Sequence, residues 1–334
     1  MRRLLRFLLR ALIVVVALVV VLAALFAYFG YTPFSAVPRL SGTRTKGTIT
    51  VAGLTRTYST YVPRDLPKGS PLVEVLHGSG ENGARIRVET GYGFDRLADE
   101  HHFAIAYPNA YEGDWDVCSI VGAIRANGGN VDDVGFLSAL ADKLSTEIGV
   151  DRDRVFAVGS SRGGSMALRL ALEAPSSFRA VAAASASVPA PENFKCKPAG
   201  HGTCSVMIMN GTDDPLMPFN GGNVSLFGLF YRNGKVLSSR ASGQYFADLN
   251  KITGPPATSD TPMAAGVHVE RFLWRNASNV EVELVAVHGA GHGIPQPYRR
   301  RPRLLGPSPM DLNGPEVIWA FFERQRPNRR EGTP

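Results

Sequence analysis

The sequence predicts an α/β fold with a mostly parallel central sheet, helices on both of its faces, and one transmembrane helix ahead of it. Two observations predict the sheet: short runs rich in Val, Ile and Ala recur along the chain, and stretches of helical periodicity separate most of them. The apolar runs are residues 72–76, 103–107, 155–158, 180–186, 206–209 and 280–287. A third observation, an uncharged apolar run over residues 11–29, predicts the preceding helix.

The first 30 residues form an N-terminal segment apart from the fold. The apolar run has about the length that crosses a bilayer as a helix, and it is longer than the core of most signal peptides. A good small-residue cleavage site is missing, so we expect an uncleaved anchor, with secretion as the alternative if the segment is cleaved. The basic flank before the run stays in the cytoplasm, which places the remainder of the chain outside it.

The domain boundaries follow from shifts in composition. Residues 31–46 are rich in Pro, Ser, Gly and Thr, which is typical of a linker. We assign residues 47–325 to one large domain and residues 326–334 to a basic tail. The domain begins with alternating apolar and polar residues on both sides of Ala52-Gly53, which predicts an antiparallel hairpin.

Helices and loops are expected in the rest of the domain. Helical patterns cover residues 132–149, the segment after Ser161, residues 236–250 and residues 315–326. Residues 218–235 and 253–267 fit the alternation of strand and helix poorly, so we interpret them as loops near a functional site.

The composition argues against nucleic-acid partners and metal sites. The formal net charge is +7, but much of the excess arginine lies at the two ends of the chain, and no nucleic-acid-binding motif accompanies it. Outside the cytoplasm cysteines pair, and the closeness of Cys196 and Cys204 predicts a disulfide that leaves Cys118 unpaired. Cys196, His201 and Cys204 lack a fourth ligand at a spacing typical of zinc, so no metal is expected.

Residues 159–163 read G-S-S-R-G, a G-x-S-x-G motif between an apolar run and a helical pattern. A sharp strand-to-helix turn of this kind lifts the serine hydroxyl clear of the sheet, and the flanking glycines avoid Cβ clashes. Ser161 is therefore the predicted nucleophile. The N-terminus of the following helix also offers unpaired N–H groups to a developing oxyanion.

A serine nucleophile needs a base and an acid that orients the base, and two later apolar runs lead into both. Residues 280–287 are followed by His288 and His292, and residues 206–209 by Asp213 and Asp214. We favour His292 because it follows a Gly-Ala-Gly bend that carries it over the sheet edge. Asp214 precedes a proline, which restricts its backbone to an extended conformation.

An oxyanion hole is predicted after an early apolar run, where residues 77–80 read His-Gly-Ser-Gly. There a backbone N–H can face the carbonyl oxygen of a substrate. We assign the donors as the main-chain N–H groups of Ser79 and Arg162. His77 is expected to be structural, with its ring bonded to neighbouring main chain.

Taken together, these motifs resemble the extracellular polyhydroxybutyrate depolymerase and feruloyl esterase group of α/β-hydrolases over residues 47–323. The motifs that carry the resemblance are "LHGSG", "YPNAYEGDWD", "VDDVGFLSALADKL", "RVFAVGSSRGGSMALRLA", "NGTDDPLMPF", "GAGHG" and "EVIWAFF". The resemblance implies an α/β-hydrolase fold and a triad of Ser161, Asp214 and His292. Trp115 matches the family pattern and is a candidate wall of the substrate cleft or a core residue. Arg162 departs from the pattern, because family members commonly carry Ala after the nucleophile.

The sequence thus predicts an extracytoplasmic serine esterase that works through an acyl-enzyme. Its expected substrates are polyhydroxyalkanoate, feruloyl or acetyl polysaccharide, or a related ester, and a polymeric one is allowed. We expect a monomer that uses no cofactor and contacts the membrane through its N-terminal helix. One alternative is an acyltransferase on the same fold, which transfers the acyl group to a sugar hydroxyl. Another is a non-catalytic surface binding module, which the complete Ser, Asp and His set disfavours.

Overall fold

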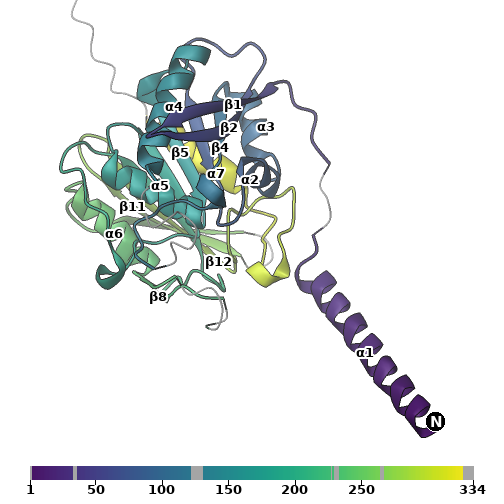
Figure 1. The fold of residues 1–334 in the computed structure, drawn as a ribbon. Coiled ribbons are helices and arrows are strands. Elements are labelled where there is room, and N and C mark those ends of the chain that lie inside the picture. Colours follow the sequence, from purple (N-terminus) through teal and green to yellow (C-terminus); the bar gives the residue numbers. More distant parts are fainter. Residues whose placement is uncertain are drawn as a thin grey trace, which may run out of the picture.

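A mixed sheet of ten strands, counted over the described residues, forms the centre of the molecule (Figure 1). The computed structural model describes residues 2–32, 36–121, 131–226, 228, 233–263 and 267–325. The strand order is β1-β2-β4-β3-β5-β6-β7-β12-β11-β10. These strands are β1 (Thr43–Val51), β2 (Leu54–Val62), β3 (Leu72–Leu76), β4 (Ala104–Pro108), β5 (Val155–Ser160), β6 (Ala180–Ala184), β7 (Ser205–Gly211), β10 (Ala257–Pro262), β11 (His268–Arg275) and β12 (Glu281–His288).

The middle of the sheet, from β4 to β12, is parallel, and antiparallel pairs extend it at both ends. Every residue of β3, β4, β5, β6 and β7 is buried. Such continuous burial is expected of parallel strands that are covered on both faces. Because successive side chains point to opposite faces, each of these strands contributes to two hydrophobic cores.

Helices cover both faces of the sheet (Figure 1). On one face Phe136 and Phe246 join a core formed with α4, α5 and α6, and on the other Phe94 and Phe321 join a core formed with α2, α3 and α7. The predicted architecture of a mostly parallel sheet between helices is therefore confirmed. The helices are α2 (Gly83–Glu89), α3 (Gly93–His101), α4 (Asp133–Ile148), α5 (Arg162–Glu173), α6 (Ser239–Leu249) and α7 (Gly314–Arg324).

The predicted hairpin is confirmed, whereas the predicted loops contain strands. β1 and β2 pair antiparallel from Thr43 with Val62 to Val51 with Leu54, around Ala52-Gly53. The two stretches expected to be loops hold the short pair β8 (Gly222–Asn223) and β9 (Lys235–Val236), and the edge strand β10. All six residues of β10 are exposed, so this strand carries no buried apolar face that a sequence pattern could show.

The N-terminal helix α1 (Arg2–Phe29) projects away from the sheet and its covering helices (Figure 1). None of its described residues is buried. It is the one helix in the described part of the chain that is long and apolar enough to cross a membrane. An apolar helix at this position is also typical of a signal sequence.

The cysteines pair differently from the sequence prediction. A disulfide joins Cys118 to Cys196, whose Cα atoms are 5.0 Å apart, and Cys204 is a buried free thiol. The predicted bond between Cys196 and Cys204 is therefore wrong. The reason is that residues 118–120 run antiparallel beside residues 193–195, with Lys195 N–H donating to the Cys118 carbonyl at 2.9 Å. This pairing places Cys118 next to Cys196, while Cys204 lies in the hydrophobic core at the start of β7.

Candidate active site

Ser161 occupies the sharp turn between β5 and α5. Its backbone has φ 57° and ψ −120°, a conformation that residues other than glycine rarely adopt. The turn is tight enough that a Cβ on Gly159 would lie 2.1 Å from the Gly163 carbonyl carbon, and one on Gly163 would lie 2.2 Å from the Leu76 carbonyl oxygen. The glycines of the motif are therefore required by close packing, and they hold Ser161 at the end of the strand.

His292 and Asp214 form a buried pair beside this turn. The Asp214 carboxylate lies 2.8 Å and 3.1 Å from His292 Nδ1, and Asp214 Oδ1 also accepts hydrogen bonds from the backbone N–H groups of Leu216 and Met217. Burial alone would raise the pKa of Asp214. The attraction of His292 and these hydrogen bonds outweigh burial and hold that pKa below its usual value.

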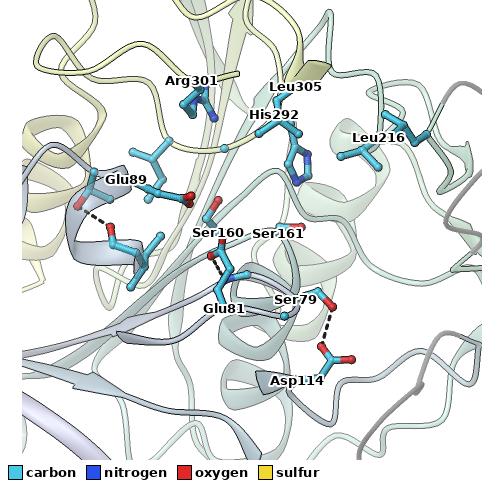
Figure 2. Close-up of a pocket in the computed structure, with 17 residues that line it drawn as sticks. Ser79, Glu81, Glu89, Asp114, Ser160, Ser161, Leu216, His292, Arg301 and Leu305 are labelled. Atoms are coloured by element: carbon cyan, nitrogen blue, oxygen red, sulfur yellow. Dashed lines mark hydrogen bonds between the residues drawn. The ribbon is translucent and has the colours of Figure 1, made fainter. Parts of the chain in front are cut away.

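His292 faces Ser161 across the cavity (Figure 2). Since Nδ1 is bonded to Asp214, Nε2 is the ring nitrogen left for the serine side. Two backbone N–H groups hold the loop that carries His292: His292 N–H donates to the Leu305 carbonyl at 2.7 Å, and Gly293 N–H donates to the side-chain Oγ of Ser185 at 2.6 Å. The structure thus brings together the three side chains that the sequence singled out.

The alternative histidine and aspartate lie elsewhere. His288 stacks on His268 with ring centroids 3.9 Å apart, and its Nε2 lies 3.4 Å from Glu270. Asp213 is exposed, and one of its oxygens accepts a hydrogen bond from Thr212. Neither side chain hydrogen-bonds to His292 or Asp214 within the described residues.

Ser79 and Arg162, the predicted oxyanion-hole residues, belong to one polar network. Neither backbone N–H donates to an acceptor in the described part of the chain. Ser79 Oγ donates to Asp114 Oδ1 at 3.1 Å, and the Arg162 guanidinium lies 3.3 Å from the same oxygen. Arg162 Nε also donates to the Trp115 carbonyl. Arg162, which departs from the family pattern, therefore helps to fix Ser79 through the Asp114 carboxylate that both side chains contact.

Trp115 is not a wall of the cavity. It is fully buried in the core, where its indole N–H donates to the His77 carbonyl at 2.9 Å. Of the two alternatives for Trp115, the cleft wall is therefore wrong and the core position is confirmed, because the ring packs against His77 with centroids 5.1 Å apart. His77 is structural, as expected: one ring nitrogen bonds to the Gly78 carbonyl, and the other accepts from Ala110 N–H. Burial, the largest influence, lowers the pKa of His77 to about 4, so the ring is neutral.

A cavity of about 540 Å³ opens over Ser161 and His292 (Figure 2). Leu216, Leu226 and Leu305 give part of its wall an apolar character. The wall also contains ionisable groups that the sequence analysis did not select, namely Glu81, Glu89, Asp114 and Arg301. No pattern distinguishes them in the sequence, because they come from separate loop and helix segments. Within the described residues, no group of three or more His, Cys, Asp or Glu side chains is arranged to hold a metal ion.

Glu81 is a cavity carboxyl with a strongly raised pKa. Burial, followed by the nearby Glu89 carboxyl, raises the pKa of Glu81 to about 8. One of its oxygens accepts the Gly78 N–H at 3.0 Å. Glu81 is therefore largely protonated at neutral pH, and it anchors the loop that presents Ser79.

Comparison with known proteins places this site in a family. Residues 51–216 match the family described as "Putative esterase". The protein named "Putative esterase NocK" from Nocardia uniformis subsp. tsuyamanensis is 31% identical over 306 residues, which cover 87% of this chain and 86% of that protein. The chain belongs to this esterase family. It is thus a carboxylic-ester hydrolase, and the predicted resemblance to feruloyl esterases is confirmed at the level of the family.

Other relatives of this esterase are more distant. Feruloyl esterase C from Emericella nidulans is 27% identical over 184 residues, which cover 53% of this chain and 62% of that protein, so the match spans about three fifths of its length. A solved structure of an acetyl xylan esterase from Aspergillus awamori superposes with a TM-score of 0.56 at 16% identity, covering 84% of this chain and 99% of that one. The second likeness shows a shared α/β-hydrolase fold.

Proposed function

We propose that this esterase is a serine hydrolase in which Ser161 is the nucleophile, His292 the general base and Asp214 the orienting acid. The observation that carries the proposal is the buried pair of His292 and Asp214 facing Ser161 at the end of β5. A carboxylate bonded to Nδ1 keeps the proton on that nitrogen, so Nε2 can accept a proton from the serine.

The reaction follows from these positions. Ser161 Oγ attacks the carbonyl carbon of the ester while His292 Nε2 takes the hydroxyl proton. The imidazolium then gives that proton to the departing alkoxide, which leaves an acyl-enzyme and a free alcohol. Water attacks the acyl carbon as His292 removes its proton, and the proton returns to Ser161 as the carboxylic acid is released.

The backbone N–H groups of Ser79 and Arg162 are the proposed oxyanion-hole donors. Both belong to residues beside Ser161, and both lack an acceptor in the described chain. Donors that are fixed before the reaction stabilise the negative charge that develops on the carbonyl oxygen, at a typical value of about 3 to 4 kcal/mol per donor. The bond from Ser79 to Asp114 and the contact of Arg162 with the same carboxylate support this rigidity.

The proposed substrates are feruloyl or acetyl polysaccharide, polyhydroxyalkanoate or a related ester. The names of the relatives, a feruloyl esterase and an acetyl xylan esterase, support the feruloyl and acetyl esters. We further propose that the catalytic domain, assigned from sequence to residues 47–325 and preceded in the sheet by residues 43–46 of β1, acts outside the cytoplasm as a monomer, held at the membrane by α1. A protein that begins near Ser41 should then be soluble and active, whereas the full chain should sediment with membranes. An N-terminus of the native protein that begins after Ala27 would contradict the anchor.

The catalytic assignment is tested with a fluorophosphonate probe, which reacts with an activated serine. The parent protein should be labelled and should hydrolyse 4-nitrophenyl butyrate, whereas Ser161→Ala should do neither and remain folded by thermal melting. Ser165→Ala is the matched control, because Ser165 lies in the first turn of α5 and not in the wall of the cavity. This control should keep the labelling. Labelling that persists in Ser161→Ala would refute the assignment.

A further inference from the structure

Arg301 lies in the cavity wall with its charged group unpaired. The residue is only 9% exposed, and Nη1 and Nη2 are buried without a hydrogen-bond partner among the described residues. Buried guanidinium groups are normally paired, because an uncompensated buried charge is strongly unfavourable. An arginine in this state is therefore expected to have a partner that arrives with the ligand.

The guanidinium is close to the reacting groups. A Cβ on Gly293 would lie 2.0 Å from Arg301 Nη1 and 3.5 Å from Ser160 Oγ, so the guanidinium packs directly against the residue that follows His292. Gly293 also has φ 104°, and a side chain there would occupy the place of the guanidinium. Figure 2 shows Arg301 at the cavity on the same side as Glu89, with Ser160 and Ser161 below it.

The nearby acids do not neutralise Arg301 by direct contact. Asp214 is bonded to His292, and Glu89 is paired with Arg85 at 2.6 Å. Both act on Arg301 only through space, and burial, the larger influence, lowers the pKa of Arg301 to about 10. The group still carries its positive charge at neutral pH. Glu81 is held protonated under the same conditions, so it supplies no negative charge to neutralise Arg301.

We propose that Arg301 binds a carboxylate carried by the ester substrate, next to the ester that Ser161 attacks. The planar fork of a guanidinium matches the two oxygens of a carboxylate. One unpaired positive charge suits a singly charged group, and the neighbouring Glu89 disfavours a dianion. The substrate class is then an ester with a free acid group, either in its acyl part, as in a monoester of a dicarboxylic acid, or in its alcohol part, as in an ester of a hydroxy acid. The inference rests on the proposed function.

The test compares each acid with its neutral amide. The acyl arm uses the ethyl monoester of glutaric acid and the corresponding terminal amide; the alcohol arm uses 4-acetoxybutanoate and 4-acetoxybutanamide. Hydrolysis is followed by titration of the released acid. Depending on whether Arg301 faces the acyl or the alcohol part of the ester, one of the two arms should show a preference. In that arm, kcat/KM of the parent protein should be at least about tenfold higher for the carboxylate than for the amide, because the buried guanidinium gains its partner.

Three variants separate recognition from structure. In Arg301→Gln the ratio of kcat/KM for carboxylate over amide should fall by about tenfold or more, to about one, because the charge that pairs with the carboxylate is lost. Arg301→Lys should restore part of the preference. Arg300→Gln, a matched change at the exposed neighbouring residue, should keep it. Without ligand, the melting temperature of Arg301→Gln should equal or exceed that of the parent, since an unpaired buried charge is removed.

The outcomes are distinguishable from failure of the proposed function. If the parent hydrolyses the ester bond of both amide-bearing compounds but shows no preference for either carboxylate, the role of Arg301 is refuted and the esterase assignment stands. If no ester is hydrolysed and the fluorophosphonate does not label Ser161, the proposed function fails. In that case, calorimetry of 4-acetoxybutanoate and of the glutarate monoester with Ser161→Ala decides whether Arg301 binds a carboxylate. Absent binding, or binding that survives the added Arg301→Gln change, would overturn the proposal.

Discussion

Replacing Asp214 by asparagine should lower kcat by about 10³ to 10⁴, although the two side chains have nearly the same shape. Asp214 Oδ1 accepts the backbone N–H groups of Leu216 and Met217, and these bonds would hold the amide oxygen of an asparagine in the same place. The amide nitrogen would then point at His292 Nδ1. An N–H at that position favours the tautomer with its proton on Nε2, which cannot accept a proton from Ser161.

The size of the fall in kcat also follows from the attraction between the Asp214 carboxylate and the His292 imidazolium. The carboxylate lies 2.8 Å from His292 Nδ1, and opposite charges with centres about 4 Å apart attract by about 4 kcal/mol at an effective dielectric of 20. The imidazolium that forms in the transition state loses this attraction in Asp214→Asn. Since about 1.4 kcal/mol corresponds to a factor of ten in rate, the loss alone accounts for about 10³.

The assay is the turnover of 4-nitrophenyl butyrate by variants whose melting temperatures show that they are folded. Asp213→Asn is the matched control, because Asp213 is adjacent and exposed, and its side chain hydrogen-bonds only to Thr212 within the described part of the chain. Its kcat should fall by about tenfold or less, as expected for an exposed side chain outside the reacting groups. The reverse order of the two variants, or a folded Asp214→Asn that retains a tenth of the parent activity, would refute the reasoning.

Two further predictions concern the cysteines and Glu81. Peptide mapping of the native protein should find Cys118 joined to Cys196, and iodoacetamide should modify Cys204 only after unfolding, because burial raises the pKa of that thiol to about 12; a peptide that links Cys196 to Cys204 would contradict the structure. Reduction of the disulfide, which spans 78 residues, should lower the free energy of unfolding by up to about 4.5 kcal/mol, as followed by urea denaturation. Glu81 keeps its proton in the folded state up to about pH 8 but loses it near pH 4.5 when unfolded, so it makes stability fall as pH rises between these values. The urea midpoint of Glu81→Gln should therefore decline less than that of the parent between pH 5 and pH 8.5; parallel declines would show that Glu81 ionises normally.

The parts of the fold that sequence predicted are those with a local signal. The turn at Ser161 has glycines two residues to either side and lies between an apolar strand and a helix, so the motif and its neighbours carry the whole geometry. The buried parallel strands appear as continuous apolar runs for a similar reason. By contrast, β10 is exposed along its length and β11 mixes Glu270 and Arg271 with apolar residues, so neither shows a clear period.

The features that sequence missed depend on contacts between distant segments. The disulfide partner of Cys196 is set by the antiparallel pairing of residues 118–120 with residues 193–195, which spacing along the chain does not show. Arg300 and Arg301 are likewise identical in type and adjacent in sequence. Arg300 is exposed and Arg301 is buried in the cavity wall, because the loop that follows His292 returns Arg301 to the cavity that Ser161 also lines. Chain position alone therefore cannot separate a solvated arginine from one at the site.

The backbone conformation of Ser161 sets a conflict between thermal stability and activity. A residue with a side chain in this region of φ and ψ is strained by about 1 to 3 kcal/mol, and glycine relieves that strain. Ser161→Gly and Ser161→Ala both lack the hydroxyl, so the difference between their melting temperatures isolates the strain, less the greater freedom of glycine in the unfolded chain. Directed evolution of this protein by heat resistance alone would consequently favour glycine at position 161 and discard the nucleophile, and a selection for robust variants has to score turnover at every round.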